Sequence, residues 1–162
     1  MDLNKDIDLV RINKDNYLDF SKLLEWRRNG EEQGEFPGYK DEKLKNFLKE
    51  YNILNSDMFY IFAAKKDNKF IAYINAVLIP KPDPRLGLLY VDELWTAPPY
   101  RKQGIAERLM NEVFKLGKEL DLWRIRLDVS EKNHVARKLY KKVGFSESDV
   151  CMFSEKSVDT IE

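Results

Sequence analysis

A strand, a glycine turn and a long amphipathic helix follow one another between residues 88 and 120, and this succession constrains the fold strongly. Residues 88–96 are rich in strand-forming side chains, and Pro98 and Pro99 then end the strand. Apolar residues recur at helical spacing after the turn, at Ile105, Leu109, Val113, Leu116 and Leu120. Residues 123–129 alternate between apolar and polar side chains. A helix between two such strands predicts a parallel crossover within one sheet.

The rest of the chain predicts a mixed sheet around this crossover. Two strands, 59–64 and 70–79, are joined by a turn at residues 67–69. The other expected elements are a strand at 8–12, helices at 15–26, 40–51 and 133–143, and closing strand segments at Phe145 and 150–153. The order β-α-α-β-β-β-α-β-α-β predicts an α/β (mixed α+β) fold, with about six to seven strands and helices on both faces.

Composition limits the classes of function. The 162 residues suit a single domain over 1–162, with a polar tail from about residue 157. Lys plus Arg and Asp plus Glu both number 28, which argues against broad nucleic-acid binding. No apolar run approaches the roughly 20 residues that span a bilayer, and the N-terminus lacks a signal-peptide pattern. The single cysteine, Cys151, cannot form an internal disulfide, so we expect a cytoplasmic protein. The single histidine, His134, argues against a metal site. We therefore expect no metal, nucleic-acid or membrane partner.

The glycine turn predicts an anion site. The first turn of a helix leaves backbone N–H groups without intrahelical partners, and its dipole favours negative charge. Gly104 has no Cβ, so a ligand can approach the backbone closely, and Arg101 and Lys102 add positive charge. The sequence Gly-Lys-Ser/Thr does not follow the turn, which argues against a kinase-like nucleotide site.

Two motifs give the turn a more specific meaning. Arg101, Gly104 and Ala106 match the pattern Arg/Gln-x-x-Gly-x-Gly/Ala. The pattern Asn-x-x-Ala-x-x-Leu-Tyr-x-x-x-Gly-Phe is matched by Asn133, Ala136, Leu139, Tyr140, Gly144 and Phe145. Together, in this order and with a strand between them, they resemble the GNAT superfamily of acyl-CoA-dependent N-acetyltransferases, a family of transferases that bind coenzyme A.

The resemblance implies acetyl-CoA as co-substrate and a set of residues that bind it. The pyrophosphate would lie on the backbone amides of the glycine turn, and the pantetheine arm would pair with the preceding strand. The implied binding residues are Leu94, Trp95, Thr96, Arg101, Lys102, Gln103, Gly104, Ile105, Ala106 and Asn133. The family often has Val at Thr96 and Gly at Ala106. Asn133 also suits a plain helix N-cap.

Acyl transfer needs a base and an acid, and the resemblance implies Asp92 and Tyr140. A base removes the proton from the acceptor amine, and Tyr140 would protonate the departing sulfur. Strict alternation places Tyr90, Asp92, Leu94 and Thr96 on one side of the strand and Val91, Glu93 and Trp95 on the other. Glu93, Asp128 and water remain alternative bases, and Asp92 can also be a surface or capping carboxylate. Tyr140 can also be an aromatic residue at the edge of the core.

The resulting hypothesis is an N-acetyltransferase of the EC 2.3.1 type that transfers acetyl directly within a ternary complex. The alternative is a non-catalytic acyl-CoA-binding domain for sensing or protein interaction. The acceptor is a small-molecule amine or a peptide or protein amine, which the fold does not distinguish, nor does it set the acyl-chain preference. A loop with Glu31, Glu32 and Glu35 could attract a cationic acceptor, with Phe36 and Tyr39 as walls, or be solvated. A homodimer is possible.

Overall fold

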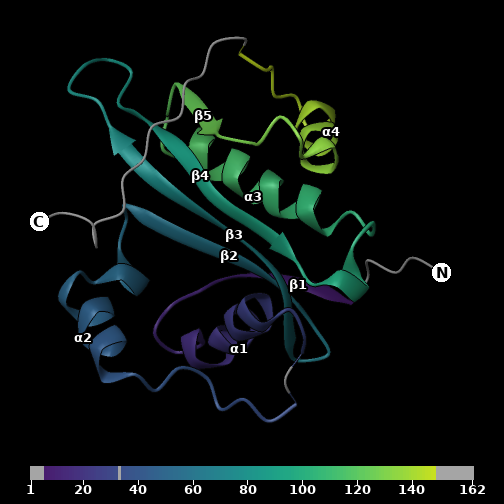
Figure 1. Cartoon of the computed structure of the whole chain (residues 1–162). Coiled ribbons are helices and arrows are strands. Elements are labelled where there is room, and N and C mark those ends of the chain that lie inside the picture. The colour runs from purple at the N-terminus through teal and green to yellow at the C-terminus, as the bar shows by residue number, and fades with distance from the viewer. Residues whose placement is uncertain (1–5, 33, 149–162) are drawn as a thin grey trace, which may run out of the picture. The chain divides into compact units, whose positions relative to one another are not determined.

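The computed structural model describes residues 6–32 and 34–148, which belong to two compact units. The first unit ends at Asp128 and the second begins at Val129. The first holds a sheet of five strands, β1 (Ile7–Arg11), β2 (Phe59–Lys66), β3 (Lys69–Pro80), β4 (Gly87–Thr96) and β5 (Arg124–Leu127), as Figure 1 shows. Its helices are α1 (Tyr17–Asn29), α2 (Glu42–Glu50) and α3 (Ile105–Glu119), with short 3-10 turns at Ile53–Asn55 and Pro98–Tyr100. The second unit holds α4 (His134–Lys142).

The order of elements confirms the predicted mixed α/β architecture. The strands lie in the order β1-β2-β3-β4-β5. The first four pair antiparallel, and β5 returns parallel to β4 after α3, as the crossover pattern predicts. Five strands are present in the described part of the chain, against the expected six to seven. The predicted strand at 150–153 lies outside that part, and Phe145 is not in a strand.

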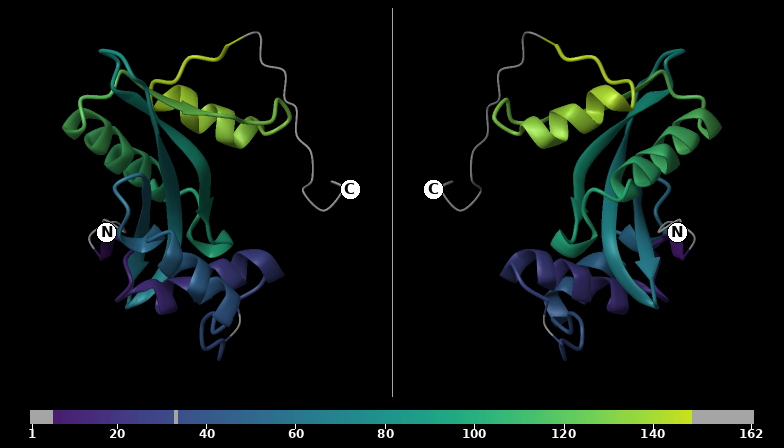
Figure 2. Two further views of the ribbon diagram at one scale, coloured as in Figure 1. Left: turned by 90° about the vertical axis from the view of Figure 1, so that its left-hand side faces the viewer. Right: turned by 90° about the vertical axis from the view of Figure 1, so that its right-hand side faces the viewer.

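Helices cover both faces of the sheet in the first unit. Residues 70–76 of β3 are buried without interruption, and since successive side chains point to opposite faces, both faces are covered. On one face Phe20 of α1 packs edge-on against Tyr73, with ring centroids 5.4 Å apart. On the other, Gly117 of α3 approaches Leu89 and Ile125 so closely that an added Cβ would lie 3.8 Å and 3.3 Å from their side chains. Figure 2 shows α1 and α3 on the two sides of the strands.

Within the described residues, no helix combines the length and the apolar character needed to cross a membrane.

The loop after α1 is fastened to that helix by its own backbone. Gly38 is buried with φ +89°, and a Cβ there would lie 2.5 Å from the carbonyl oxygen of Leu18. The next amide, that of Tyr39, donates to the Ser21 hydroxyl at 2.8 Å. Only glycine combines this backbone conformation with this approach, so residues 34–40 are held against α1 by a position that the sequence pattern did not single out.

Replacing Gly38 by Ala is therefore expected to lower the free energy of unfolding by about 2 kcal/mol or more, because backbone strain and a backbone clash add. Urea unfolding followed by circular dichroism measures the loss. Gly34→Ala is the matched control, since a Cβ there has nothing within 4 Å, and it should change stability by less than about 0.5 kcal/mol. Equal stabilities of the two variants would contradict the close approach at Gly38.

Candidate active site

A β-bulge in β4 lies at Asp92. Asn75 of β3 pairs with Glu93, but the next residue, Ala76, pairs with Val91, so Asp92 is an extra residue in β4. Because of the extra residue, side chains after the bulge point to the opposite face of the sheet from the one that regular alternation would give. Leu89, before it, packs on the α3 side near Gly117, as described above.

Trp95, after the bulge, packs on the opposite side. Its ring lies 6.2 Å from that of Trp26 in α1, with the two planes at 75°. Strict alternation would place Leu89 and Trp95 on one face, so the predicted alternation across Asp92 is wrong. The extra residue in the strand is the reason.

The same position is where β4 parts from β5. Their parallel pairing runs from Leu88 with Arg124 to Val91 with Leu127 and stops one residue before Asp92. Beyond Asp92, the edge of β4 that faces away from β3 has no strand partner among the described residues. Such an edge offers N–H and C=O groups to an extended ligand. Leu94, Trp95 and Thr96, the residues expected to pair with a pantetheine arm, form this edge and are half-buried.

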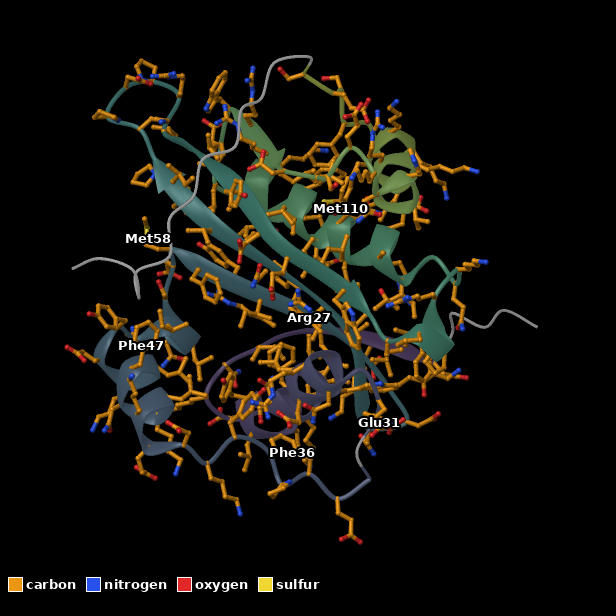
Figure 3. The ribbon with its side chains drawn as sticks, in the orientation of Figure 1. Arg27, Glu31, Phe36, Phe47, Met58 and Met110 are labelled. Atoms are coloured by element: carbon orange, nitrogen blue, oxygen red, sulfur yellow. The ribbon has the colours of Figure 1, made fainter. Side chains whose placement is uncertain are left out.

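Glu93 is held by two side chains of the first unit. One carboxylate oxygen lies 2.5 Å from Nη1 of Arg27, and the other accepts from the Tyr73 hydroxyl at 2.7 Å. Arg27 also donates to the Tyr73 hydroxyl. Figure 3 shows Arg27 on the side of α1 that faces the sheet.

The electrostatic consequence is that the Glu93 carboxylate stays ionised and bound to Arg27 and Tyr73. Burial alone raises the pKa of Glu93, but the hydrogen bonds from Arg27 and Tyr73 and the charge of Arg27 outweigh it and hold the pKa below its usual value. Burial and the neighbouring Glu93 carboxylate raise the pKa of the Tyr73 hydroxyl. Asp92, one residue earlier, is exposed. Two adjacent carboxylates therefore have different environments.

The third candidate base is also engaged. Asp128, just after β5, accepts a hydrogen bond from the Tyr90 hydroxyl at 2.9 Å. This contact keeps Tyr90 and Asp128 together at the β4–β5 pairing. It engages one oxygen of the Asp128 carboxylate.

The glycine turn has the conformation that an anion site needs. Lys102 and Gly104 both have positive φ, 61° and 76°, and Gly104 is the N-cap of α3. A Cβ on Gly104 would have nothing within 4 Å, so the approach to the first amides of α3 is open.

The side chains of the turn brace its backbone. Nε of Arg101 donates to the Thr96 carbonyl at 2.9 Å, and the Gln103 amide donates to the Pro99 carbonyl at 3.2 Å. Lys102 is exposed. Ile105 is buried and Ala106 half-buried, and they anchor the start of α3. The residues present fit a pyrophosphate on backbone N–H groups with cations beside it.

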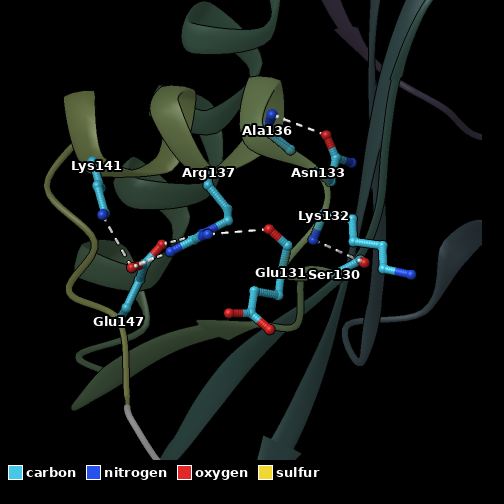
Figure 4. A network of polar contacts seen from close by, with 8 residues as sticks. All are labelled: Ser130, Glu131, Lys132, Asn133, Ala136, Arg137, Lys141 and Glu147. Atoms are coloured by element: carbon cyan, nitrogen blue, oxygen red, sulfur yellow. Dashed lines mark hydrogen bonds and ion pairs between the residues drawn. The ribbon is translucent and has the colours of Figure 1, made fainter.

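The second unit contains the other two predicted residues. Oδ1 of Asn133 accepts from the Ala136 amide at 3.1 Å, so Asn133 is the N-cap of α4 (Figure 4). The ring of Tyr140 lies 5.8 Å from that of Phe145. Burial raises the pKa of the Tyr140 hydroxyl, which keeps it protonated at neutral pH.

A salt-bridge network fixes the segment after α4. Arg137 binds both carboxylate oxygens of Glu147, at 2.7 Å and 2.8 Å, and Lys141 lies 3.0 Å from one of them (Figure 4). Arg137 also donates to the carbonyl of Glu131. The hydrogen bonds from Arg137 and Lys141 lower the pKa of Glu147 to about 2.

The loop between α1 and α2 contains the predicted acidic residues. Glu31 and Glu35 are exposed, while Glu32 forms an ion pair with Lys69. Phe36 and Tyr39 pack edge-on, with ring centroids 5.5 Å apart. Figure 3 marks Glu31 and Phe36 at this end of the first unit. Among the residues that the structure describes, no group of three or more His, Cys, Asp and Glu side chains could hold a metal ion.

Sequence reasoning missed Arg27, Tyr73 and Asn75. Arg27 and Tyr73 are 66 and 20 positions away from Glu93, beyond the reach of local periodicity, and nothing in the pattern connected them. Asn75 had one signal. It is a polar residue inside an otherwise apolar stretch of strand, and such a residue needs a buried partner.

Comparison with known proteins identifies the class. Residues 20–145 match the model of the Acetyltransferase (GNAT) family. The chain therefore belongs to the GNAT acetyltransferase family. It is an acetyl-CoA-dependent N-acetyltransferase of the EC 2.3.1 type, and its family binds acetyl-CoA. The predicted family, fold class and enzyme activity are thus confirmed.

Individual relatives are distant but cover nearly the whole chain. Aminoglycoside N(6')-acetyltransferase type 1 of Salmonella enteritidis is 23% identical over 155 residues, which are 93% of this chain and 99% of that protein. An aminoglycoside acetyltransferase from an uncultured soil metagenomic sample, solved with sisomicin, superposes with a TM-score of 0.78 at 17% identity, covering 96% and 99% of the two chains. Aminoglycoside N-acetyltransferase AAC(6')-Iy, solved with CoA, gives a TM-score of 0.70 at 20% identity, covering 93% and 94%.

Replacing Glu93 by Gln is expected to lower the free energy of unfolding at pH 7 by about 1–2 kcal/mol, because Arg27 loses its ionic partner. The folded pKa of Glu93 lies below its unfolded value. Its stabilisation is therefore present above the unfolded pKa and is lost as pH falls through the folded pKa. Urea unfolding across the acid range should show the two proteins converge at low pH.

Asp92→Asn is the matched control for this stability measurement. Asp92 is the adjacent carboxylate and is exposed, so the change should leave the free energy of unfolding within about 0.5 kcal/mol of the parent. A gap between Glu93→Gln and the parent that stays constant down to the acid limit would contradict an ionised, ion-paired Glu93.

Proposed function

We propose that Asp92 is the general base of the transfer. The observation that carries this proposal is its position as the exposed extra residue of the β4 bulge, where β4 parts from β5. Glu93 is engaged by Arg27 and Tyr73, and Asp128 by Tyr90. A lysine-like amine has a reference pKa of about 10.4, so only about one molecule in 10³ is neutral at pH 7. Asp92 removes the excess proton through water and leaves a neutral nucleophile.

Tyr140 is proposed as the acid. Its raised pKa keeps the hydroxyl protonated, and a phenol donates readily to a thiolate. The amine nitrogen attacks the acetyl carbonyl carbon, the C–S bond breaks, and the sulfur takes the Tyr140 proton to give the free thiol. Asp92 takes the first proton of the ammonium group before the attack and later releases it to solvent. The second proton, which the nitrogen loses as the amide forms, passes through water to the Tyr140 phenolate and restores the hydroxyl.

The proposed contacts to acetyl-CoA are mostly main-chain. Amides from Gln103 to Ala106 bind the pyrophosphate, with Arg101 and Lys102 as nearby cations. The backbone of Leu94–Thr96 pairs with the pantetheine arm, and Asn133 contacts that arm while it caps α4. The open approach at Gly104 and the edge of β4 without a strand partner support this assignment.

The proposed acceptor is an aminoglycoside or a closely similar cationic small molecule with a primary amine. Relatives that cover nearly the whole chain are aminoglycoside acetyltransferases. The physical support is the exposed pair of carboxylates at Glu31 and Glu35, which attract a polycation, beside the aromatic pair of Phe36 and Tyr39. Glu32 contributes less, because Lys69 neutralises it.

For the two catalytic roles, Asp92→Asn is expected to lower kcat about 10²–10³-fold at pH 7, and Tyr140→Phe about 10–10²-fold. The deficit of Asp92→Asn should shrink as pH rises toward the pKa of the acceptor amine, since solvent then supplies the neutral nucleophile. Stopped assays of released thiol give both profiles. Unchanged turnover in either variant would reject the role assigned to that residue.

For the acceptor, thiol release from acetyl-CoA should be fastest with aminoglycosides such as sisomicin, and at least about tenfold slower with simple diamines and with a peptide N-terminus, which carry fewer charges to attract. Mass spectrometry of the product locates the acetyl group on a primary amine. Faster turnover of the peptide would exclude an aminoglycoside as the preferred acceptor. No turnover of any amine, with acetyl-CoA still bound, would favour the non-catalytic binding domain.

A further inference from the structure

We propose that Asn75 of β3 is a positioning residue, which holds the bulge that presents Asp92. This inference rests on the proposed role of Asp92 as the base. The amide of Glu93 donates to Oδ1 of Asn75 at 2.7 Å. The register shift of the β3–β4 pair begins at the same residue, Asn75. A side chain therefore takes the place of a ladder acceptor where the strand gains its extra residue.

The surroundings of Asn75 are largely buried. Asn75 is 9% exposed, and its neighbours Ile74 and Ala76 are fully buried. This burial limits the access of water to the bond, and a buried N–H without an acceptor is costly. An apolar side chain at this position would leave the amide of Glu93 to regain a backbone partner. Regular pairing, with a one-residue slip of β4, is the arrangement that provides one.

A slip of this kind removes the bulge. It returns Asp92 to the regular ladder and changes the side of the sheet that its carboxylate faces. Catalysis is sensitive to such displacements, since a misplacement of about 1 Å can cost about 10²-fold in rate.

Glu93 is fixed at a second point, which makes the bulge stiff. Its carboxylate is bound by Arg27 of α1 and Tyr73 of β3, while its amide is bound by Asn75. The residue next to the proposed base is therefore anchored through both main chain and side chain. Support from surrounding residues of this kind keeps a reactive group in its productive geometry.

The test compares Asn75→Ala with Asn75→Asp. The alanine variant removes the acceptor, and kcat is expected to fall at least about 30-fold. The aspartate variant keeps Oδ1 in place and should recover kcat to within about fivefold of the parent. NMR should show the cross-strand contacts between β3 and β4 displaced by one residue in Asn75→Ala and kept as in the parent in Asn75→Asp.

The control is Tyr60→Phe. It removes a different hydrogen bond, the part-buried one from the Tyr60 hydroxyl to the Asp57 carbonyl at 2.6 Å, and should leave kcat within about twofold. All assays run below the unfolding midpoint of every variant. If Asn75→Ala does not fold, Asn75→Ser replaces it, because its shorter side chain places the oxygen farther from the amide of Glu93.

A double mutant separates positioning from a direct role. If Asn75 acts through Asp92, adding Asn75→Ala to Asp92→Asn should cost less than about threefold further. Independent, multiplying losses would overturn the proposal, as would kcat of Asn75→Ala equal to that of the Tyr60→Phe control. Parent-like cross-strand contacts between β3 and β4 in Asn75→Ala would overturn it on structural grounds alone. Failure of Asp92 as the base shows separately, as unchanged turnover of the Asp92→Asn single variant.

Discussion

The hydrogen bond from the Glu93 amide to the Asn75 side chain lies where β4 gains its extra residue. It stabilises an extra residue in a strand that is otherwise regularly paired. Because the bulge shifts the phase of β4, the strand packs Leu89 toward α3 and Trp95 toward α1. Side chains of this one strand thus pack into the core on the α3 side and on the α1 side of the sheet. The change of side occurs at the residue that we assign as the base.

In the proposed mechanism, the two carboxylates at this point have different roles, one structural and one chemical. Glu93 carries its charge against Arg27 and a tyrosine hydroxyl, so its ionised form stabilises the fold. Asp92 is exposed and, in the proposed mechanism, takes the proton of the acceptor amine. Neighbouring carboxylates with different environments are a recurrent way to separate such roles.

The cofactor half of the proposed site relies on backbone rather than side chains. A strand edge and the first turn of α3 supply donors and acceptors that most sequences can provide. This is consistent with fold similarity at a TM-score of 0.78 and only 17% identity. The proposed acceptor half depends on side chains, including Glu31, Glu35, Phe36 and Tyr39. Specificity within this fold is therefore expected to come from that half.

The sequence by itself determined the order of the elements, the parallel crossover and the family, because helical and strand periodicity and the two motifs are local. It also located the glycine turn. Tertiary structure decided the bulge, the exchange of faces across Asp92 and the engagement of Glu93. These depend on a contact over 18 positions, from Asn75 to Glu93, and on Arg27 from another helix. Alternation is a property of one strand, whereas register is settled by pairing between strands, and that is why the predicted alternation failed at Asp92.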